Sequence, residues 1–484
     1  MPGGHAARSL TVAMAVQGSL LFDSSPKPVG GDGPTGVRRY TGSFSVPEAT
    51  RLLWRAGFGP KRQSAVERTP AQLAALGLDG AVDALFTPAA RRLEGPEPYT
   101  EFGPLENPAN FPYDHLWWFD RMVRSTMQLE ERMALLWHDW FGVSNDQVGQ
   151  YTLMADHIDL FRTKGLGSFR DLLQAVTVDG AMLVRLDGDD NQKGIANENY
   201  ARELMELYTL GPDRGAYTET DVREAARGLT GYRSDYVASR GGYVDFEYVP
   251  SRHDDGEKVV FGRRDDYLPA EVVDATLAHP QHASFFVLKL WSSFVAVPPS
   301  AGQRLALETL YVESGYDIAT VLRAILTHED LYTGPPLVKQ PVVFGAGLLR
   351  AVGRGVETIG WPVMSEQAGQ RLFLPPNIAG WREDRWLDTS TIQARWTLAR
   401  YVLNHHELGP DEDYPAAETP AQAVDAALAH WNGAVVHDDT RAVLEATARA
   451  IATIASGYST GQRNALRQDI LRHLVATCPD QQVC

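Results

Sequence analysis

Helical periodicity from Ser45 to the C-terminus constrains this chain more than any other feature of its sequence. Apolar residues recur at spacings of three and four, which is the pattern of a helix that buries one face. The pattern is plain in the stretches YDHLWWFDRMVRS, LEERMALLWHDWF, GSFRDLLQAVTVDGAML and DIATVLRAILTH. The sequence therefore predicts a mainly α fold, a multi-helix globular domain.

This periodicity gives way to a different pattern in the middle of the chain. The stretch YVDFEYV alternates polar and apolar residues, and EKVVFG is short and apolar. Both patterns are typical of β-strands. We therefore expect a small β-hairpin insertion at about residues 232–267.

Composition indicates how the rest of the chain is divided. Residues 22–45 are rich in Gly, Pro and Ser, which indicates a linker. We expect an N-terminal arm and linker over residues 1–45 and a single mainly helical domain over residues 46–484. The Ala-rich C-terminal part of that domain, at about residues 415–484, again has a helical pattern.

The net charge of the chain limits its partners. The formal charge is -16 at pH 7, and the sequence contains no run of Lys and Arg. Nucleic acids and anionic membrane surfaces require a basic patch, and no stretch approaches the roughly 20 continuous apolar residues of a membrane span. We therefore expect no nucleic-acid partner and no membrane partner. The N-terminal segment makes a poor signal peptide, which favours a cytoplasmic protein.

The cysteine count and the absence of several motifs limit the chemistry. The only cysteines are Cys478 and Cys484, so neither a disulfide framework nor a cysteine-based zinc site is expected. The chain has no P-loop and no Gly-x-Gly-x-x-Gly after a strand, so no nucleotide cofactor is expected. A metal site would have to use His, Asp, Glu or Asn.

The stretch GIANENYARELMELYTLG, from Gly194 to Gly211, is unusually rich in polar groups. On a helical wheel Asn199, Glu203 and Glu206 fall within about 60° of one another. Such a face is typical of an ordinary solvated helix, but acidic residues three apart repel each other and are seldom found without a cation nearby. The stretch is therefore either a solvated face or a buried polar site.

Two histidines accompany this stretch. His138 lies between Trp137 and Trp140 at the margin of an apolar face, where a hydrogen-bonded core histidine is the ordinary explanation. His253 precedes Asp254 in a turn after the predicted strand, and surface-turn chemistry explains such aspartates well. Each histidine is also a candidate ligand or acid/base group.

Taken in order, nine blocks of this sequence resemble the domain-of-unknown-function family eighteen hundred, from about Val46 to the end of the chain. The blocks include LLWRAGFGP, ERMALLWHDWFGVS, NQKGIANENYARELMELYTLG, HDDGEKVVFG and GQRLFLPPNIAGWREDRWLDTSTIQAR. The family is large, mainly bacterial and often exported, and the resemblance implies no particular reaction. Tyr232 stands where the family usually has Trp, and the export signal common in the family is not evident here.

The resemblance assigns family motifs to particular positions of this chain. The matched residues are Asn197, Glu198, Asn199, Arg202, Glu203 and Glu206 in the polar helix, Trp137 and His138, His253 and Asp254, and Pro375, Pro376, Asn377, Gly380 and Trp381.

Three functional classes follow from these residues. The first is a metal-dependent enzyme, such as a cytoplasmic biosynthetic tailoring enzyme, in which His138, Glu203, His253 and Asp254 hold Fe, Mn or Zn. The second is a metal-free enzyme on a sugar or aromatic substrate. The third is a non-catalytic binding or assembly protein in which Arg202, Glu198 and Glu203 form a structural ion-pair network.

For an enzyme of either kind we expect a small-molecule or glycan-like substrate. The candidate catalytic residues are His138, Arg202, Glu203 and Glu206, since burial near tryptophan would tune a carboxyl group for proton transfer. The candidate substrate-binding residues are Trp137, Trp140, Glu198, Asn199, Asn377 and Trp381.

Overall fold

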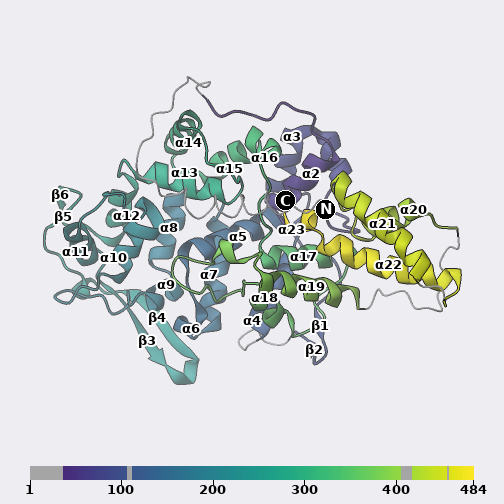
Figure 1. Cartoon of the computed structure of the whole chain (residues 1–484). Coiled ribbons are helices and arrows are strands. Elements are labelled where there is room, and N and C mark those ends of the chain that lie inside the picture. Colours follow the sequence, from purple (N-terminus) through teal and green to yellow (C-terminus); the bar gives the residue numbers. More distant parts are fainter. Residues whose placement is uncertain (1–35, 106–111, 405–416, 455–456) are drawn as a thin grey trace. The chain divides into compact units, whose positions relative to one another are not determined.

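The computed structural model describes residues 36–105, 112–404, 417–454 and 457–484 (Figure 1). These residues are mainly helical and include three small two-stranded antiparallel sheets. The mainly α fold with a small β insertion is therefore confirmed. Most of the predicted N-terminal arm, residues 1–35, lies outside the described residues.

The described residues form two compact units, each assembled from segments that are separated in the sequence. Unit 1 contains the residues up to Thr41 together with Glu130–Pro335 and Phe373–Trp381. Unit 2 contains Gly42–Leu129, Pro336–Leu372 and Arg382–Cys484. The single domain expected over residues 46–484 stays a prediction.

Unit 1 holds the polar helix, the β insertion and the helices that surround them. Its helices are α5 (Gln128–Phe141, from Glu130 onward), α6 (Asn145–Val148), α7 (Tyr151–Lys164), α8 (Phe169–Thr177), α9 (Gly180–Arg185), α10 (Asn199–Glu203), η1 (Leu204–Leu210), α11 (Glu219–Gly228), α12 (Pro269–Leu277), α13 (His282–Ser292), α14 (Ala301–Glu313), α15 (Ile318–Leu326) and α16 (Glu329–Thr333). Short 3₁₀ turns are η2 (Ala238–Arg240) and η3 (Pro250–Arg252).

Unit 2 is built from helices at both ends of the chain. They are α2 (Val46–Arg55), α3 (Pro70–Phe86), α4 (Tyr113–Arg124), α17 (Pro341–Val352), α18 (Trp361–Gln367), η4 (Glu383–Arg385), α19 (Thr389–Leu403), α20 (Pro420–His430), α21 (Asp438–Ile454), α22 (Thr460–Thr477) and α23 (Pro479–Gln482), with strands β1 (Tyr99–Thr100) and β2 (Gly103–Pro104). Helices α20, α21 and α22 pack against one another and occupy the Ala-rich C-terminal region (Figure 1).

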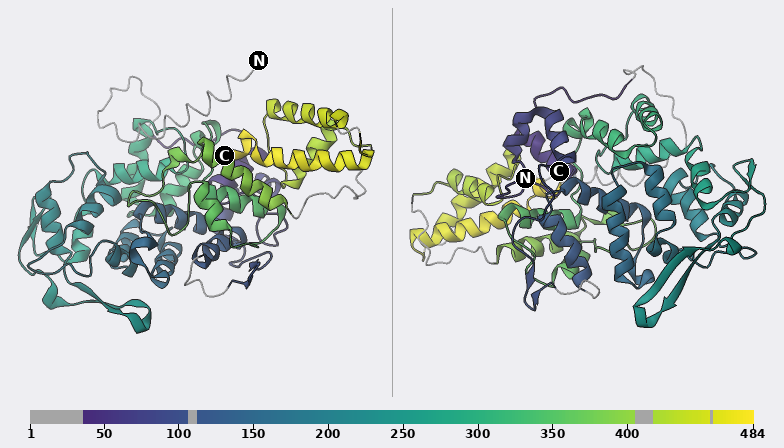
Figure 2. Two further views of the ribbon diagram at one scale, coloured as in Figure 1. Left: turned by 60° about the horizontal axis from the view of Figure 1, so that its bottom comes forward. Right: turned by 180° about the vertical axis from the view of Figure 1, so that it is seen from behind.

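The β insertion contains two hairpins where the sequence analysis expected one. Strand β3 (Tyr232–Val237) pairs with β4 (Gly242–Tyr248), and β5 (Lys258–Val260) pairs with β6 (Arg263–Asp265). YVDFEYV, which contains β4, and EKVVFG, which contains β5, do not pair with each other, because each has a partner strand nearer in sequence. The turn after β5 has only two residues, Phe261 and Gly262, and both have positive φ, as a tight hairpin requires. Figure 2 shows the β3–β4 hairpin projecting from the helices of unit 1.

The second half of the polar helix is wider than an α-helix. Helix α10 continues directly into η1, a π-helix, over residues that were expected to be α-helical. The last four carbonyl groups of η1 are among those that lack a partner inside the helix. Here each accepts a hydrogen bond of 3.0 to 3.2 Å from a side chain: Leu207 from Lys289, Tyr208 from Trp140, Thr209 from His282 and Leu210 from Arg214.

Aromatic side chains form much of the core of unit 1. Trp137 and Trp140 pack 5.2 Å apart between ring centroids, and Phe169 lies within 6.0 Å of both. Phe286 stacks on Tyr311 at 4.1 Å. The wide apolar arc of α5 is thus covered by neighbouring helices. No helix among the described residues is long and apolar enough to cross a membrane.

Removing one of the side chains that bind the π-helix carbonyls should destabilise unit 1. His282 is fully buried, its Nδ1–H donates to Thr209 O at 3.0 Å, and its Nε2 lies 2.9 Å from the Tyr311 hydroxyl. His282→Phe leaves both partners buried and unsatisfied, so we expect a loss of about 3 kcal/mol in the free energy of unfolding in urea. His473→Phe, at a half-exposed position, should change it by less than about 0.5 kcal/mol. Equal stability of the two variants would contradict this role.

Candidate functional site

The two carboxylates singled out in the sequence lie at the junction of α10 and the π-helix. Glu203 is the last residue of α10, and Glu206 lies in the first turn of η1. Both are half-buried. Burial and then the negative charge of Glu206 raise the pKa of Glu203, whereas Arg185 and Arg202 lower it. The negative charge of Glu206 therefore acts on the ionisation of Glu203, as their spacing predicted.

Two side chains that the sequence analysis did not single out belong with them. The Tyr217 hydroxyl donates a long hydrogen bond of 3.4 Å to Glu206 Oε2, and burial together with Glu206 raises the pKa of Tyr217 to about 12. Arg185 ends α9 and is close enough to Glu203 to lower its pKa. We call Arg185, Glu203, Glu206 and Tyr217 the glutamate cluster.

Arg185 has no side-chain partner among the described residues. Its Nε is buried without a hydrogen bond, and its guanidinium forms no ion pair with any residue that the structure describes. By contrast, Arg162 forms a bidentate pair with Glu131, and Arg227 forms one with Asp254. The glutamate cluster thus has donors that the protein itself does not use.

Arg202, a predicted catalytic residue, is engaged on the outer side of the helix. It donates to Glu198 at 3.0 Å and to both carboxylate oxygens of Glu219 at 2.8 and 2.9 Å. The three side chains are between 35% and 69% exposed. The third functional class predicted an ion-pair network of Arg202 with Glu198 and Glu203. The observed partners of Arg202 are Glu198 and Glu219.

Asn199, a predicted substrate-binding residue, lies at the exposed start of α10. Its Nδ2 donates to Asp187 Oδ2 at 3.0 Å, and its backbone N–H donates to Asn197 Oδ1 at 2.9 Å. The backbone N–H of Asn197 in turn donates to Asn191 Oδ1 at 2.9 Å. The asparagine-rich approach therefore satisfies the backbone groups at the helix start.

His138 is fully buried in an aromatic environment. Its ring centroid lies 5.4 Å from that of Trp381, 6.0 Å from that of Phe373 and 6.4 Å from that of His157. Burial, and then His157, lower its pKa well below the ordinary value of 6.5. His138 is therefore neutral at physiological pH.

His157, which the sequence analysis did not single out, forms a buried pair with Asp179. His157 Nδ1–H donates to Asp179 Oδ2 at 2.8 Å, and the same oxygen accepts from Met182 N at 3.0 Å at the start of α9. The Nε2 atom of His157 is buried and has no hydrogen-bond partner among the described residues. The N-cap pattern of Asp179 before GAML was the available signal for the aspartate; nothing in the sequence indicated its histidine.

His253 and Asp254 lie in the turn that follows η3. His253 is 5% exposed, and its Nδ1–H donates to Thr230 O at 2.9 Å, which leaves Nε2 buried without a hydrogen bond in the described structure. Asp254 accepts two hydrogen bonds from Arg227 and one from its own turn at Gly256 N. Arg227 holds the pKa of Asp254 below its ordinary value.

Trp137 and Trp140 are 0% and 2% exposed, as their apolar helix predicted. Trp137 Nε1 donates to Gly165 O at 2.9 Å, and Trp140 Nε1 donates to Tyr208 O at 3.2 Å. Both indole N–H groups are therefore used inside the protein. Their role in binding a substrate stays a prediction.

The PPN and GW motifs lie in one turn. Asn377 is exposed, and its Oδ1 accepts from Ala379 N at 2.8 Å. Gly380 has φ +91°, and a Cβ there would lie 2.2 Å from Asp139 Oδ1. Only glycine fits, so that the next backbone N–H, of Trp381, can donate to Asp139 Oδ1 at 2.7 Å. Burial raises the pKa of Asp139, against the attraction of Lys289.

The four predicted metal ligands do not assemble. In the described parts of the chain, no three or more His, Cys, Asp or Glu side chains lie close enough to hold a metal ion together. His138 contacts the Trp381 ring, Glu203 interacts with Glu206 and Arg185, and the His253–Asp254 turn is bonded to Thr230 and Arg227. A metal at these residues stays a prediction.

Comparison with known proteins identifies the family. The sequence pattern of the family described as "Protein of unknown function (DUF1800)" matches residues 51–483, so the chain belongs to this family. No curated protein and no solved structure matches the chain. The family assignment covers both units, and functional arguments depend on the geometry of the site itself.

The network of Arg202 should contribute little to stability because its side chains are largely solvated. Arg202→Met should lower the free energy of unfolding by less than about 1 kcal/mol, as for other exposed ion pairs. Arg162→Met is the contrasting control. Its partner Glu131 is 3% exposed, and removing one member of a buried pair costs about 3 to 5 kcal/mol. Urea unfolding measures both. A large loss for Arg202→Met would show that the network is a structural element of unit 1.

Proposed function

We propose that this protein is an enzyme that carries out proton transfer at the glutamate cluster, on a small substrate bearing a negatively charged group. The observation that carries the proposal is the combination of a half-buried carboxyl group with a raised pKa, Glu203, and an unpaired guanidinium, Arg185, beside it. Perturbed carboxyl groups of this kind concentrate at functional sites. A purely structural cluster would be expected to pair its arginine with its own carboxylates.

Glu203 is suited to act as the general base. Burial and the neighbouring charge of Glu206 raise its pKa, which makes the carboxylate a stronger base near neutral pH than an exposed glutamate. Its half-exposed position leaves one side open to a substrate. Tyr217, with a pKa of about 12, keeps its proton and can donate to Glu206 or to a substrate oxygen.

Arg185 is suited to bind the anionic group of the substrate. Its position at the C-terminal end of α9 and its pKa-lowering effect on Glu203 place its charge beside the base. A guanidinium matches a carboxylate or phosphate group with two parallel hydrogen bonds. The substrate would thus be oriented by Arg185 while Glu203 removes a proton.

Arg185 favours an anionic substrate, a narrower class than the sugar or aromatic substrate expected from the sequence. A sugar or aromatic substrate was expected from the tryptophans, whereas the free hydrogen-bonding capacity of the site belongs to Arg185. The glycan-like alternative therefore needs an anionic sugar, such as a uronic acid or a sugar phosphate.

The test compares which metabolites the wild type and a Glu203 variant convert. Purified protein is incubated with a filtered metabolite extract, and mass spectrometry compares the wild type with Glu203→Gln. We expect at least one anionic metabolite to be converted by the wild type and not by the variant, with a loss of about 100-fold or more in rate, since general-base catalysis contributes about 10² to 10⁴. Arg185→Gln should mainly raise KM.

The matched control is Glu308→Gln. Glu308 is also a half-buried glutamate of unit 1 whose pKa is raised by burial, but it lies beside Arg304 on α14. Its variant should keep wild-type activity. If no metabolite distinguishes the wild type from Glu203→Gln, or if Glu308→Gln is equally inactive, the glutamate cluster is not the catalytic site.

The pH dependence of the reaction should follow the charges around Glu203. Activity should fall as the pH drops through the raised pKa of Glu203, so the acid limb of kcat/KM should lie above the ordinary glutamate value of 4.5. Glu206→Gln removes the negative charge that raises this pKa and should move the limb to lower pH. Arg185→Gln removes a charge that lowers it and should move the limb to higher pH. Shifts in the same direction would contradict the assignment of Glu203 as base.

A divalent cation at the same carboxylates is the second candidate, and the repulsion between Glu203 and Glu206 favours it. Fe, Mn and Zn are the metals to examine. Elemental analysis of protein made in medium supplemented with all three decides between the candidates. About one metal ion per chain, lost in Glu203→Gln and kept in Glu308→Gln, would support the cation; metal content that both variants retain equally would oppose it.

A further inference from the structure

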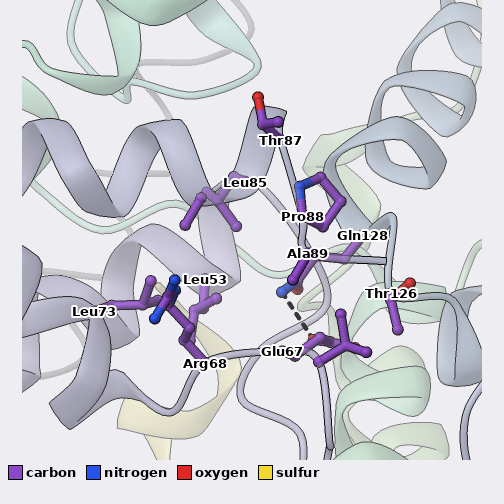
Figure 3. A pocket seen from close by; sticks show the side chains of 12 residues that line it. Leu53, Glu67, Arg68, Leu73, Leu85, Thr87, Pro88, Ala89, Thr126 and Gln128 are labelled. Atoms are coloured by element: carbon purple, nitrogen blue, oxygen red, sulfur yellow. Dashed lines mark hydrogen bonds between the residues drawn. The ribbon is translucent and has the colours of Figure 1, made fainter. Parts of the chain in front are cut away.

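Unit 2 contains a cavity that is separate from the glutamate cluster. Its volume is about 250 Å³, and it is bounded by α2, α3, the loops that flank α3 and the start of α5. The side chains at its wall are shown in Figure 3. The cavity exceeds the ~150 Å³ of an apolar cavity that holds benzene, and it approaches the roughly 300 Å³ at which ligand pockets begin.

One part of the cavity wall is apolar. Leu53, Leu73 and Leu85 are 2%, 2% and 7% exposed and come from α2 and from both ends of α3. Val66 and Ala84 continue this surface. Such a wall gains free energy by covering a hydrocarbon group and offers no hydrogen bond to it.

The two uncharged buried polar side chains of the wall are already hydrogen-bonded. Thr126 Oγ1 accepts from Arg92 N at 3.0 Å and donates to Ala90 O at 2.7 Å. Gln128 Oε1 accepts from Phe58 N at 3.3 Å, and its Nε2 donates to Glu67 Oε2 at 3.0 Å. The inner end of the cavity therefore favours the apolar part of a ligand.

The carboxylate of Glu67 does not give the cavity a negative charge. Its Oε2 accepts from Arg350, and its Oε1 lies 3.6 Å from Lys61 Nζ. Arg350 is anchored in turn by the carbonyl oxygens of Gly59 and Val123 at 3.3 and 3.0 Å. Two cations thus surround one buried anion.

The mouth of the cavity carries a free positive charge. Arg68, Thr87 and Ala89 are exposed, and Arg68 extends beside Leu53 and Leu73 (Figure 3). Arg68 has no ion pair and no side-chain hydrogen bond with another residue in the described ranges. A ligand with an apolar body inside the cavity would present its polar end to this guanidinium.

We propose that this cavity binds a small amphipathic monoanion, a carboxylate on a hydrocarbon body of about eight carbon atoms, with the hydrocarbon inside and the carboxylate at Arg68. The size follows from the comparison with the benzene-sized cavity. The orientation follows from the hydrogen-bonded Thr126 and Gln128 inside and the unpaired Arg68 at the mouth. The site is independent of the glutamate cluster, since the cavity is lined by residues of unit 2 alone.

Calorimetry with the full chain tests this site with two probes of equal length and opposite charge, octanoate and octylammonium. Octanoate should bind at one saturable site, and octylammonium should bind at least several-fold more weakly. Arg68→Gln should weaken octanoate binding up to about fivefold, the effect of one solvated ion pair, and added salt should reduce that difference. Arg385→Gln, an exposed arginine of unit 2 outside the cavity, should leave the affinity unchanged.

Two variants that fill the cavity complete the test. Ala89→Trp fills it from an exposed loop and should preserve the fold, and Ala84→Phe fills it from α3. Both should abolish octanoate binding while circular dichroism stays that of the wild type; if Ala84→Phe misfolds, Ala89→Trp decides alone. Absence of saturable binding, wild-type affinity in Ala89→Trp, equal affinity for both probes or equal weakening by Arg385→Gln would each overturn the proposal.

Discussion

The structure of unit 1 depends on how the carbonyl groups at the end of the π-helix are satisfied. The carbonyl groups at the end of a helix have no partner inside it, and leaving them buried without donors costs free energy. Unit 1 brings a lysine, a tryptophan, a histidine and an arginine from three other segments to these acceptors. The fully buried Trp140 and His282 therefore serve the backbone of η1 as well as the aromatic core. The segments that supply these donors are fixed relative to the π-helix by the same contacts.

The hydrogen bonds at the end of η1 also fix the position of the glutamate cluster. Because the end of η1 is held by its carbonyl groups, its first turn, with Glu206, is held too, and Glu203 precedes it in α10. π-helical turns occur frequently at functional sites because they redirect side chains within an otherwise regular helix. The wide turn alters the angular relation of Glu203 and Glu206 from that of an α-helix, although the two charges still act on each other. The side of the helix that faces outward carries Arg202, whose partners are both carboxylates.

The fold class followed from the sequence because helical periodicity and strand alternation are local properties. The β insertion could be predicted for the same reason, but the pairing of its strands could not. The turns on either side of YVDFEYV determine which strand it pairs with. The π-helix could not be expected from periodicity, because one extra residue per turn hardly changes a pattern read over a short stretch. Arg185, Tyr217 and the His157–Asp179 pair were missed for another reason. Their importance comes from proximity across the fold, and a single sequence does not reveal proximity.

The sequence suggested that the neighbouring carboxylates of Glu203 and Glu206 need a partner, but their partial exposure removes part of that need. Buried like charges would have required pairing, protonation or a cation, since an unpaired buried carboxylate costs several kcal/mol. Glu203 and Glu206 are half-buried, so water carries part of that cost and both carboxylates can persist without any partner. What distinguishes the cluster from a solvated face is therefore the arginine. A half-buried guanidinium beside two carboxylates, left without an ion pair while Arg162, Arg202 and Arg227 are paired, is the arrangement expected where the missing partner is a ligand.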